Sequence, residues 1–554
     1  MHLYRILITL SLCAALAAAA DWPCFRGDAQ RSGALVQPAG FPSSQTAQWT
    51  RSLSCAVVSS PAILDNMLYI GGRDSCIYAL DAQTGTVRWK KKTDGWVDAT
   101  PAANHSVVVA GSRDGIVYVL NAQTAHEVGR LRADLPLSSP VFSGDSAVII
   151  GSAASDFGLS GFALSPLFVP GAVQQADWNI NLAQGSYSSP ALSSSITVIG
   201  SNDGTLYGID PARRQIVWRL STGGGGYMAS PAISNDVVYY APGNDDRNLY
   251  AVSLQSGIVQ WRAPCLAPAA AAKRLAQMPV SGRLVAELAR LSPEHRLQMT
   301  QRLQAQGVQM PFQSDAFGKA AKTRAVAADF IPYGDSKTSS VAIGDDNIYI
   351  IQKEPGTPAP LFSLYAFDKS SGAMVWNYAE LRSCVPVGYC SSPLVAGGAV
   401  YAGWGEGMLY SFDAHSGRVL WRDTLDGDII SSPAIANGAL YVATIRGTVY
   451  SYALTATAPA IDFSQSTYCY PNPARKTVSN IQVYVARSAT LTLSILSMNE
   501  KPVTYFVRAL AAGEKYVYAW NIDNVANGVY LARVRVVYDD GKKDEKMLKI
   551  AVLK

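Results

Sequence analysis

Apolar and polar positions alternate along most of the chain in short runs that are separated by tight polar turns. Residues 67–89 show the pattern as "MLYIGGRDSCIYALDAQTGTVRW", in which three strand-like runs are separated by "RDS" and "DAQTG". Runs of this length bounded by Gly, Asp and Ser predict β-strands joined by hairpin turns. The same order returns about every 40 residues, preceded each time by a Ser-Pro or Thr-Pro segment. A unit of four short antiparallel strands with this period is typical of a β-propeller blade.

The Ser-Pro segment gives the innermost strand of each unit. Its prolines are Pro61, Pro101, Pro140, Pro190, Pro231, Pro393 and Pro433, and Val341 occupies the position in a degenerate eighth copy. Proline cannot donate to a strand ladder, so it belongs at a strand start or on an edge strand. The inner edge of a blade, which faces the central channel, meets this requirement.

Tryptophan marks the outer strand and indicates how the ring closes. The outer-strand tryptophans are Trp49, Trp89, Trp178, Trp218, Trp261, Trp376 and Trp421, and the unit around Val128 lacks one. Trp49 precedes the first Ser-Pro segment, whereas the last unit ends at "GTVYSYAL" without an outer strand. The N-terminal strand should therefore complete the last blade. We predict an all-β protein with an eight-bladed propeller at 47–453, whose closed ring hides the sheet edges.

The repeat resembles a known family. Units such as "GSRDGIVYVLNAQT" and "GWGEGMLYSFDAHSGRVLW" are similar to the PQQ-like repeat, and "DWPCFRGDAQRSG" looks like the lead-in of its secreted members, here residues 21–46. The resemblance implies an eight-bladed propeller in which the outer-strand tryptophan docks between neighbouring blades.

An insertion at about 264–338 interrupts the repeat. Leu284, Leu288 and Leu291 share a helical face, Ser292-Pro293-Glu294 is a helix start and Gly307 a helix end. We expect a helical insertion, either a hairpin packed on one propeller face or an arm that docks a partner.

A linker at 454–466 precedes a second predicted domain at 467–554. Its alternating runs "NIQVYVA", "ATLTLSIL", "KYVYAWNI", "NGVYLARVRVV" and "KMLKIAVLK" predict a small β-sandwich. The domain resembles the immunoglobulin-like domain of the flagellar hook-capping protein and the C-terminal sorting domains of type IX secretion. The matching residues include Tyr470, Pro471, Asn472, Pro473, Gly528 and Tyr530. The resemblance implies contact with secretion machinery and delivery across the outer membrane; an accessory sandwich without a sorting role is the alternative.

The N-terminus predicts export. Residues 1–20 have a basic start, an apolar run and small residues before a cleavage site between Ala20 and Asp21, as in a secretory signal peptide. No later run is long enough for a transmembrane helix. We expect an extracellular or cell-surface protein associated with the outer membrane, with the periplasm as the alternative. Oxidising surroundings permit disulfides, and Cys384 and Cys390 are the candidate pair.

Neither the composition nor the motifs indicate a catalytic, cofactor-binding or metal-binding site. With 49% hydrophobic residues a large core is expected, and a net charge of +5 does not support nucleic-acid binding. In the PQQ-like family that the repeat resembles, quinone-dependent enzymes have two adjacent cysteines next to the cofactor. This chain has no Cys-Cys pair. The aspartates of turns such as "LDAQTG" recur in many units, where a carboxylate accepts backbone N–H groups. We therefore assign no catalytic, cofactor-binding or metal-binding residue.

These observations favour a secreted, non-enzymatic scaffold that binds a protein or glycan at the cell surface and is anchored through its C-terminal domain. Two alternatives stay open. One is a quinoprotein oxidoreductase with PQQ and calcium in an atypical site, and the other is an outer-membrane protein assembly factor.

Overall fold

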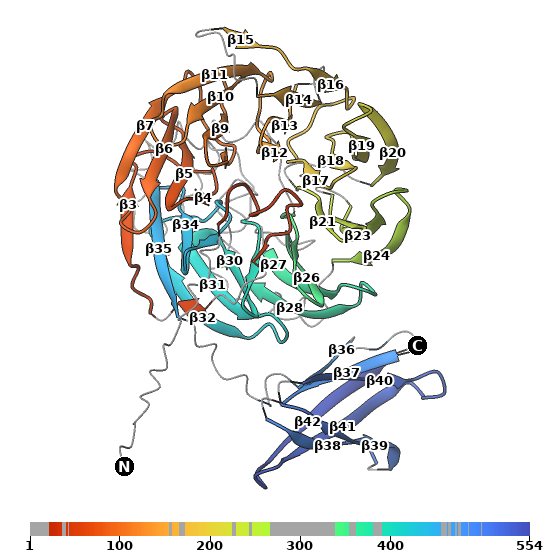
Figure 1. Ribbon diagram of the computed structural model, residues 1–554. Coiled ribbons are helices and arrows are strands. Elements are labelled where there is room, and N and C mark those ends of the chain that lie inside the picture. The colour runs from red at the N-terminus through yellow and green to blue at the C-terminus, as the bar shows by residue number, and fades with distance from the viewer. Residues whose placement is uncertain are drawn as a thin grey trace, which may run out of the picture.

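The computed structural model describes residues 21–35, 40–42, 44–154, 158–164, 172–223, 229–242, 246–265, 338–353, 362–380, 391–455, 463, 467–470, 474, 478–485, 487–499, 501–512 and 514–553. Eight sheets stand around a central axis and form a closed propeller (Figure 1). This confirms the predicted all-β, eight-bladed fold.

Each of the first seven blades has four antiparallel strands in chain order from the axis outwards. The first blade contains β4 (Ala62–Leu64), β5 (Met67–Gly72), β6 (Cys76–Asp81) and β7 (Val87–Lys92), and the second contains β8 (Ala102–Ala103), β9 (Val107–Gly111), β10 (Ile116–Asn121) and β11 (Glu127–Arg132). The third contains β12 (Val141–Ser143), β13 (Ala147–Gly151), β14 (Leu159–Ala163) and β16 (Trp178–Ile180), and the fourth contains β17 (Ala191–Leu192), β18 (Thr197–Gly200), β19 (Thr205–Asp210) and β20 (Gln215–Ser221). The fifth blade contains β21 (Ala232–Ser234), β22 (Val237–Tyr240), β23 (Asn248–Ser253) and β24 (Val259–Pro264). The sixth contains β25 (Ala342–Ile343), β26 (Asn347–Lys353), β27 (Phe362–Asp368) and β28 (Met374–Glu380), and the seventh contains β29 (Leu394–Ala396), β30 (Ala399–Gly403), β31 (Met408–Asp413) and β32 (Val419–Thr424). A single 3-10 turn, η2 (Gly405–Gly407), lies between β30 and β31 in the described chain.

The eighth blade joins the two ends of the propeller. It consists of β33 (Ala434–Ala436), β34 (Ala439–Ala443), β35 (Thr448–Thr455) and the N-terminal strand β3 (Trp49–Ser52). β3 runs antiparallel to β35, with Trp49 opposite Ser451 and Ser52 opposite Thr448. The predicted closure by the N-terminal strand is thus confirmed.

Three two-residue strands extend individual blades. β1 (Ala34–Leu35) pairs with β29 in parallel, β2 (Phe41–Pro42) pairs with β35 and β15 (Val173–Gln174) pairs with β11 in parallel.

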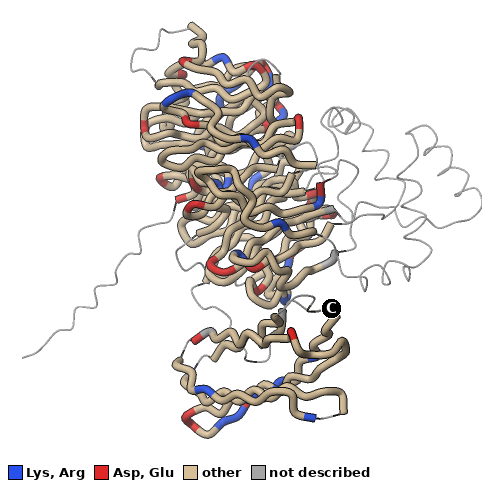
Figure 2. The backbone as a smooth tube through the Cα atoms, turned by 90° about the vertical axis from the view of Figure 1, so that its right-hand side faces the viewer, with Lys and Arg blue, Asp and Glu red and all other residues tan. Residues whose placement is uncertain are grey.

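Burial follows the position of a strand within its blade. β5 and β6 are buried at every residue, whereas the outer strand β7 alternates between exposed and half-buried side chains. Buried apolar side chains gather between neighbouring blades, as where Tyr69 and Ile77 of the first blade pack with Val108 and Tyr118 of the second. Lys, Arg, Asp and Glu are interspersed on the propeller seen edge-on (Figure 2). The hydrophobic core is therefore divided among the blade interfaces.

The blade topology gives the propeller two distinct faces. The turn between second and third strands and the link from each outer strand to the next inner strand lie on one face, which we call the connection face. The other two turns of each blade lie on the opposite face, which we call the turn face.

A second domain of two sheets follows the propeller in sequence. One sheet has the order β36 (Tyr468–Tyr470), β37 (Val478–Tyr484) and β40 (Lys515–Asn521). The other has the order β39 (Pro502–Leu510), β38 (Ala489–Ser497), β41 (Gly528–Tyr538) and β42 (Lys543–Val552). Ile481 and Trp520 from one sheet and Leu493 and Val534 from the other share one core, so the domain is a β-sandwich. Strand β39 is absent from the sequence prediction.

Within the described part of the chain, no helix is long and apolar enough to cross a membrane. The predicted signal peptide at 1–20 and the predicted helical insertion, apart from the residues at its two ends, lie outside the described residues.

Candidate functional site

The outer-strand tryptophan of the eighth blade lies against the first blade. The indole Nε1 of Trp49 donates to the carbonyl oxygen of Ala82 at 3.0 Å, and the hydroxyl of Tyr441 donates to the same oxygen at 3.1 Å. A Cβ on Gly85 would come within 2.5 Å of the Trp49 ring, and Gly85 has a φ of 68°. Glycine is therefore required at position 85 for two reasons: a side chain would collide with the indole, and the backbone is in the left-handed region.

This arrangement recurs around the ring. Three other indoles donate to a carbonyl oxygen of the next blade: Trp89 to Ala122 at 3.0 Å, Trp218 to Leu254 at 2.7 Å and Trp376 to Ala414 at 3.1 Å. Trp421 donates to Ser44 at 3.0 Å, since the outer strand of the eighth blade comes from the N-terminal segment. Trp261 packs on Gly372 of the sixth blade, and Trp178 packs on Gly161 of its own blade.

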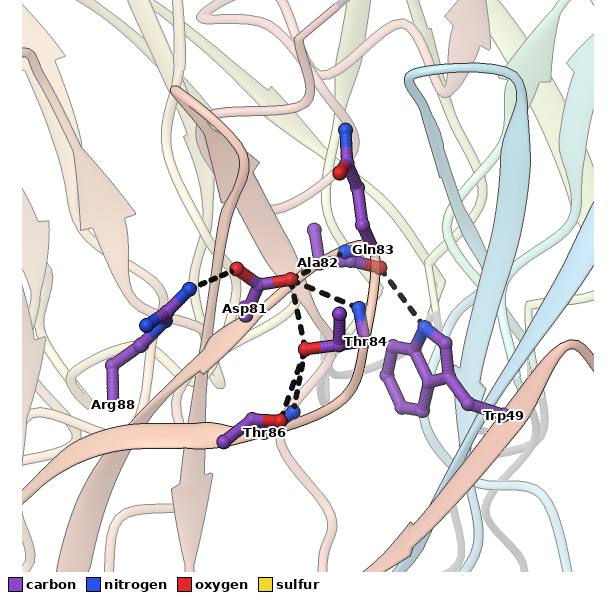
Figure 3. Close-up of polar contacts among 7 residues, drawn as sticks. All are labelled: Trp49, Asp81, Ala82, Gln83, Thr84, Thr86 and Arg88. Atoms are coloured by element: carbon purple, nitrogen blue, oxygen red, sulfur yellow. Dashed lines mark hydrogen bonds and ion pairs between the residues drawn. The ribbon is translucent and has the colours of Figure 1, made fainter.

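Asp81 shapes the turn on which Trp49 docks (Figure 3). Its Oδ1 accepts the backbone N–H groups of Gln83 and Thr84 at 3.0 and 2.9 Å. Its Oδ2 lies 2.6 Å from the guanidinium of Arg88, and this hydrogen bond lowers the pKa of the carboxyl. At the corresponding turns Asn121, Asp210, Asp368 and Asp413 also accept backbone N–H groups. Because a neutral asparagine does the same, the recurring carboxylate is a turn-forming group.

A closed ring of hydrogen bonds surrounds the channel. Eight buried hydroxyl residues, each immediately before the proline or Val341 of its inner strand, take part. The backbone N–H of each donates to the side-chain oxygen of the next at 2.9 to 3.1 Å, in the order Ser60, Thr100, Ser139, Ser189, Ser230, Ser340, Ser392, Ser432 and back to Ser60. Every bond joins two blades, so the ring links the innermost strands continuously.

The lead-in runs around the inner wall of this channel, where Figure 1 shows it in red at the centre. Inner-strand N–H groups donate to its carbonyl oxygens in succession: Ile63 to Trp22, Ala103 to Pro23, Leu192 to Ala29, Ile233 to Gln30, Ile343 to Ser32 and Val395 to Gly33. Six of the eight blades are thereby bound to one stretch of 12 residues, from Trp22 to Gly33.

Two arginines of the lead-in project into the channel and are almost completely buried, with exposures of 1% for Arg26 and 0% for Arg31. Arg31 donates to the carbonyl oxygens of Ser139, Pro140, Pro190 and Phe25 at 2.7 to 2.9 Å. Arg26 donates on the other side of the axis, to the carbonyl oxygens of Pro393 and Val341. Burial lowers the pKa of both guanidiniums, and the six hydrogen bonds offset this cost of desolvation.

The residues at this level of the channel do not fit a calcium ion. Carbonyl oxygens that could face a cation already accept hydrogen bonds from Arg26 and Arg31, and Asp28 is the carboxylate beside these two positive charges. A divalent cation placed here would be repelled by the guanidiniums. Among the residues that the structure describes, no three His, Cys, Asp or Glu side chains gather so as to hold a metal ion.

A second candidate group of side chains lies on the connection face, between the first two blades. The ring of Trp96 contacts two guanidiniums, with Cζ of Arg73 4.7 Å and Cζ of Arg113 5.0 Å from its centre. Both arginines pair with Asp98: Nε of Arg73 lies 2.8 Å from Oδ1, and Nη2 of Arg113 lies 2.6 Å from Oδ2. We call these four residues the Trp96 cluster.

The backbone holds the Trp96 cluster in place. The N–H of Arg113 donates to the carbonyl of Trp96 at 2.9 Å, and Val97 donates to Gly72 at 3.2 Å, so turns from both blades clamp the segment. The side chains of Arg73 and Asp98 are only 6% and 9% exposed, while Trp96 is half-buried. Cation–π contacts of this kind contribute about 0.5 to 2 kcal/mol each. The cluster is a mostly buried, ion-paired group of one aromatic and three charged side chains, of which Trp96 is half-buried.

Comparison with known families identifies the repeat. A family model described as outer membrane protein assembly factor BamB matches residues 41–162, 171–316 and 360–461, which is more than half of the chain. The chain belongs to the BamB family. No curated protein matches it significantly.

Solved structures support the propeller fold of this BamB-family chain. BamB from Moraxella catarrhalis matches with a TM-score of 0.50 and 15% identity, covering 74% of this chain and 99% of that one. Quinohemoprotein alcohol dehydrogenase from Comamonas testosteroni matches with a TM-score of 0.57 and 14% identity, covering 82% of this chain and 83% of that one. At these identities the likeness concerns the fold alone.

The remaining predicted residues belong to the sandwich or lie outside the described part. Tyr470 is in β36. Gly528 begins β41, and the hydroxyl of Tyr530 on the same strand donates to Ala526 at 2.9 Å while its ring meets Trp520 edge-on. Outside the described residues lie Pro471, Asn472 and Pro473 of the sorting-like motif, the candidate disulfide of Cys384 and Cys390, and Ala20 of the cleavage site, whereas Asp21 is exposed.

Sequence reasoning missed three features of this BamB-family chain: the hydroxyl ring, the two lead-in arginines and the Trp96 cluster. The hydroxyl ring had a visible signal, because Ser or Thr precedes all seven repeat prolines and the degenerate Val341. The arginines had none, since their carbonyl partners lie up to 367 residues away in the chain.

Proposed function

We propose that this protein is a non-enzymatic scaffold of the cell envelope, whose propeller binds a protein through the connection face at its first two blades. The Trp96 cluster is the observation that carries this proposal. Tryptophan and arginine are the residues most often found at energetic centres of protein interfaces. A cluster already fixed by ion pairs and backbone bonds loses little conformational freedom when a partner binds.

The C-terminal sandwich would deliver the scaffold to the cell surface. Support comes from the export signal expected at 1–20 and from the resemblance of 467–554 to sorting domains. Deletion of 467–554 is expected to leave the propeller behind in the periplasm, measured by surface proteolysis of intact cells. Unchanged surface exposure of the truncated protein would refute the sorting role.

Capture from envelope extracts tests the binding face. We expect Trp96→Ala to lower recovery of the captured protein at least tenfold, because interface centres of this type contribute about 2 kcal/mol or more. Ile258→Ala is the matched control: Ile258 is 68% exposed and follows a turn on the opposite, turn face. Equal recovery with both variants, or capture of polysaccharide alone, would contradict the proposal.

The family match favours a second candidate, a role in outer-membrane protein assembly, because the matching model and the Moraxella structure carry that name. The same capture experiment separates the two candidates. Recovery of components of the barrel-assembly machinery with the wild-type protein, and their loss with Trp96→Ala, would support the assembly role.

A further inference from the structure

The sandwich ends on one side in an edge strand with an apolar outer surface. β39 pairs with β38 on one side, and no other strand of the described chain pairs with its second side. Val503, Tyr505 and Val507 alternate along β39 and are 41%, 68% and 48% exposed. An edge of this kind offers unpaired backbone groups and apolar side chains to any extended chain nearby.

The opposite edge of the same sheet is protected. Lys543, Asp544 and Glu545 of β42 are all exposed, and Ala474 bridges to the last part of the strand at Val552. The outer propeller strand β7 is protected in the same way by exposed Arg88, Lys90 and Lys92. Charged residues on an edge strand discourage pairing with a further strand. Both of these edges thus carry charge where β39 carries valine and tyrosine.

The inner side of β39 is firmly packed, so the strand stays in place as an edge. The ring of Phe506 stacks on Tyr516 with centroids 5.6 Å apart and lies 5.0 Å from Tyr518, both on the other sheet. Leu510, at the end of β39, is buried in the sandwich core.

The sandwich domain carries a positive net charge. Residues 467–554 contain thirteen Lys and Arg against seven Asp and Glu, a net charge of +6, although the whole chain carries only +5. Lys501 and Arg508 lie at the two ends of β39 and are exposed, and Nη2 of Arg508 lies 3.3 Å from Oε1 of Glu514, so an acidic partner residue would share this guanidinium with Glu514. Figure 2 shows basic positions on the sandwich, and Arg533 and Arg535 lie on β41 of the same sheet.

We propose that β39 is a docking edge that accepts an extended strand from a partner protein. The partner strand has apolar side chains at alternate positions, which pair with Val503, Tyr505 and Val507, and acidic side chains at its ends, which face Lys501 and Arg508. Main-chain hydrogen bonds supply affinity in this mode of recognition, and the alternate side chains supply specificity. This surface is separate from the Trp96 cluster and goes beyond the binding proposed for the propeller.

Peptide binding to the full-length protein tests the proposal. The probe is a fluorescent ten-residue peptide of alternating Val and Thr with Glu at both ends, measured by fluorescence anisotropy. Tyr505→Lys places a charge in the middle of the edge and is expected to weaken binding at least tenfold. Met547→Lys, on the protected strand β42 at a site that is 43% exposed, is the matched control and should change binding less than twofold.

The charge requirement is tested with the same peptide carrying Lys at both ends, which should bind at least fivefold more weakly. No binding of the acidic peptide to the wild-type protein would overturn the proposal, as would equal binding by Tyr505→Lys. Concentration-dependent dimers in light scattering that Tyr505→Lys abolishes would also overturn it, because a second copy would then occupy the edge. Circular dichroism of the variants verifies folding, since both substituted side chains are exposed.

Discussion

At the scale of single residues, the recurring aspartate, glycine and tryptophan form one docking device. Asp81 fixes a turn, the turn presents the carbonyl of Ala82, and the indole of Trp49 from the neighbouring blade binds it. A carboxylate at this position acts through backbone geometry, and its repetition around the ring follows from the repetition of the blade. The PQQ-like repeat therefore indicates a propeller fold and does not by itself indicate an enzymatic reaction.

Asp81→Asn is expected to cost less than about 1 kcal/mol at pH 7, because an amide oxygen keeps the turn and a half-exposed ion pair contributes little. Asn121 shows that the amide accepts the same backbone bonds. Asp81→Ala should cost about 1 to 2 kcal/mol, since the turn loses its acceptor. Urea denaturation of both variants measures these values, and equal stability of the Ala variant and the wild type would disprove the role.

The same carboxyl gives a pH dependence with a defined sign. Its pKa is lowered in the folded protein, so it stabilises the fold above its unfolded pKa of about 3.9 and loses this effect as the pH falls through the folded value. The stability difference between wild type and Asp81→Asn should therefore shrink below about pH 4. A stability difference between the two proteins that increases below about pH 4 would contradict this prediction.

At the scale of structural elements, the innermost strands are held by the ring of hydroxyl groups as well as by their own blades. Ser189→Ala removes the acceptor of the Ser139 N–H, which is buried, and should cost about 1 to 3 kcal/mol. Ser189→Thr should cost much less, because Thr100 already fills one position of the ring. Thermal or urea unfolding of the two variants checks this, and an Ala variant as stable as the Thr variant would show that the ring does not contribute.

Most elements could be predicted from the sequence because they repeat. Period, turn chemistry and the early position of Trp49 together indicated eight blades and their closure. β39 was missed because "PVTYFVRAL" begins with a proline and places Phe506 between Tyr505 and Val507, which interrupts the alternation of apolar and polar residues. The Trp96 cluster was missed because its parts come from a link and two turns of different blades, which only the folded ring brings together.

At the scale of the whole molecule, the lead-in occupies part of the central axis of the propeller. One segment binds the inner strands of six blades, and Arg26 and Arg31 reach opposite sides of the channel. The lead-in therefore couples blades that do not touch each other.

Arg31→Lys is expected to lower the free energy of unfolding by more than about 3 kcal/mol. Lysine keeps the charge in the channel but cannot donate to four carbonyl oxygens at once, so it leaves buried acceptors unsatisfied. Urea denaturation measures the change. A lysine variant as stable as the wild type would show that the fork geometry of the guanidinium is not needed.

The proposed scaffold role depends on a channel that is occupied by the lead-in and holds no cofactor. Calorimetric titration of the purified full-length protein with PQQ in the presence of calcium tests it most directly, with alcohol and sugar oxidation followed by a redox dye in the same samples. We expect no saturable heat and no dye reduction. Calcium-dependent binding of one PQQ per chain with substrate oxidation would contradict it.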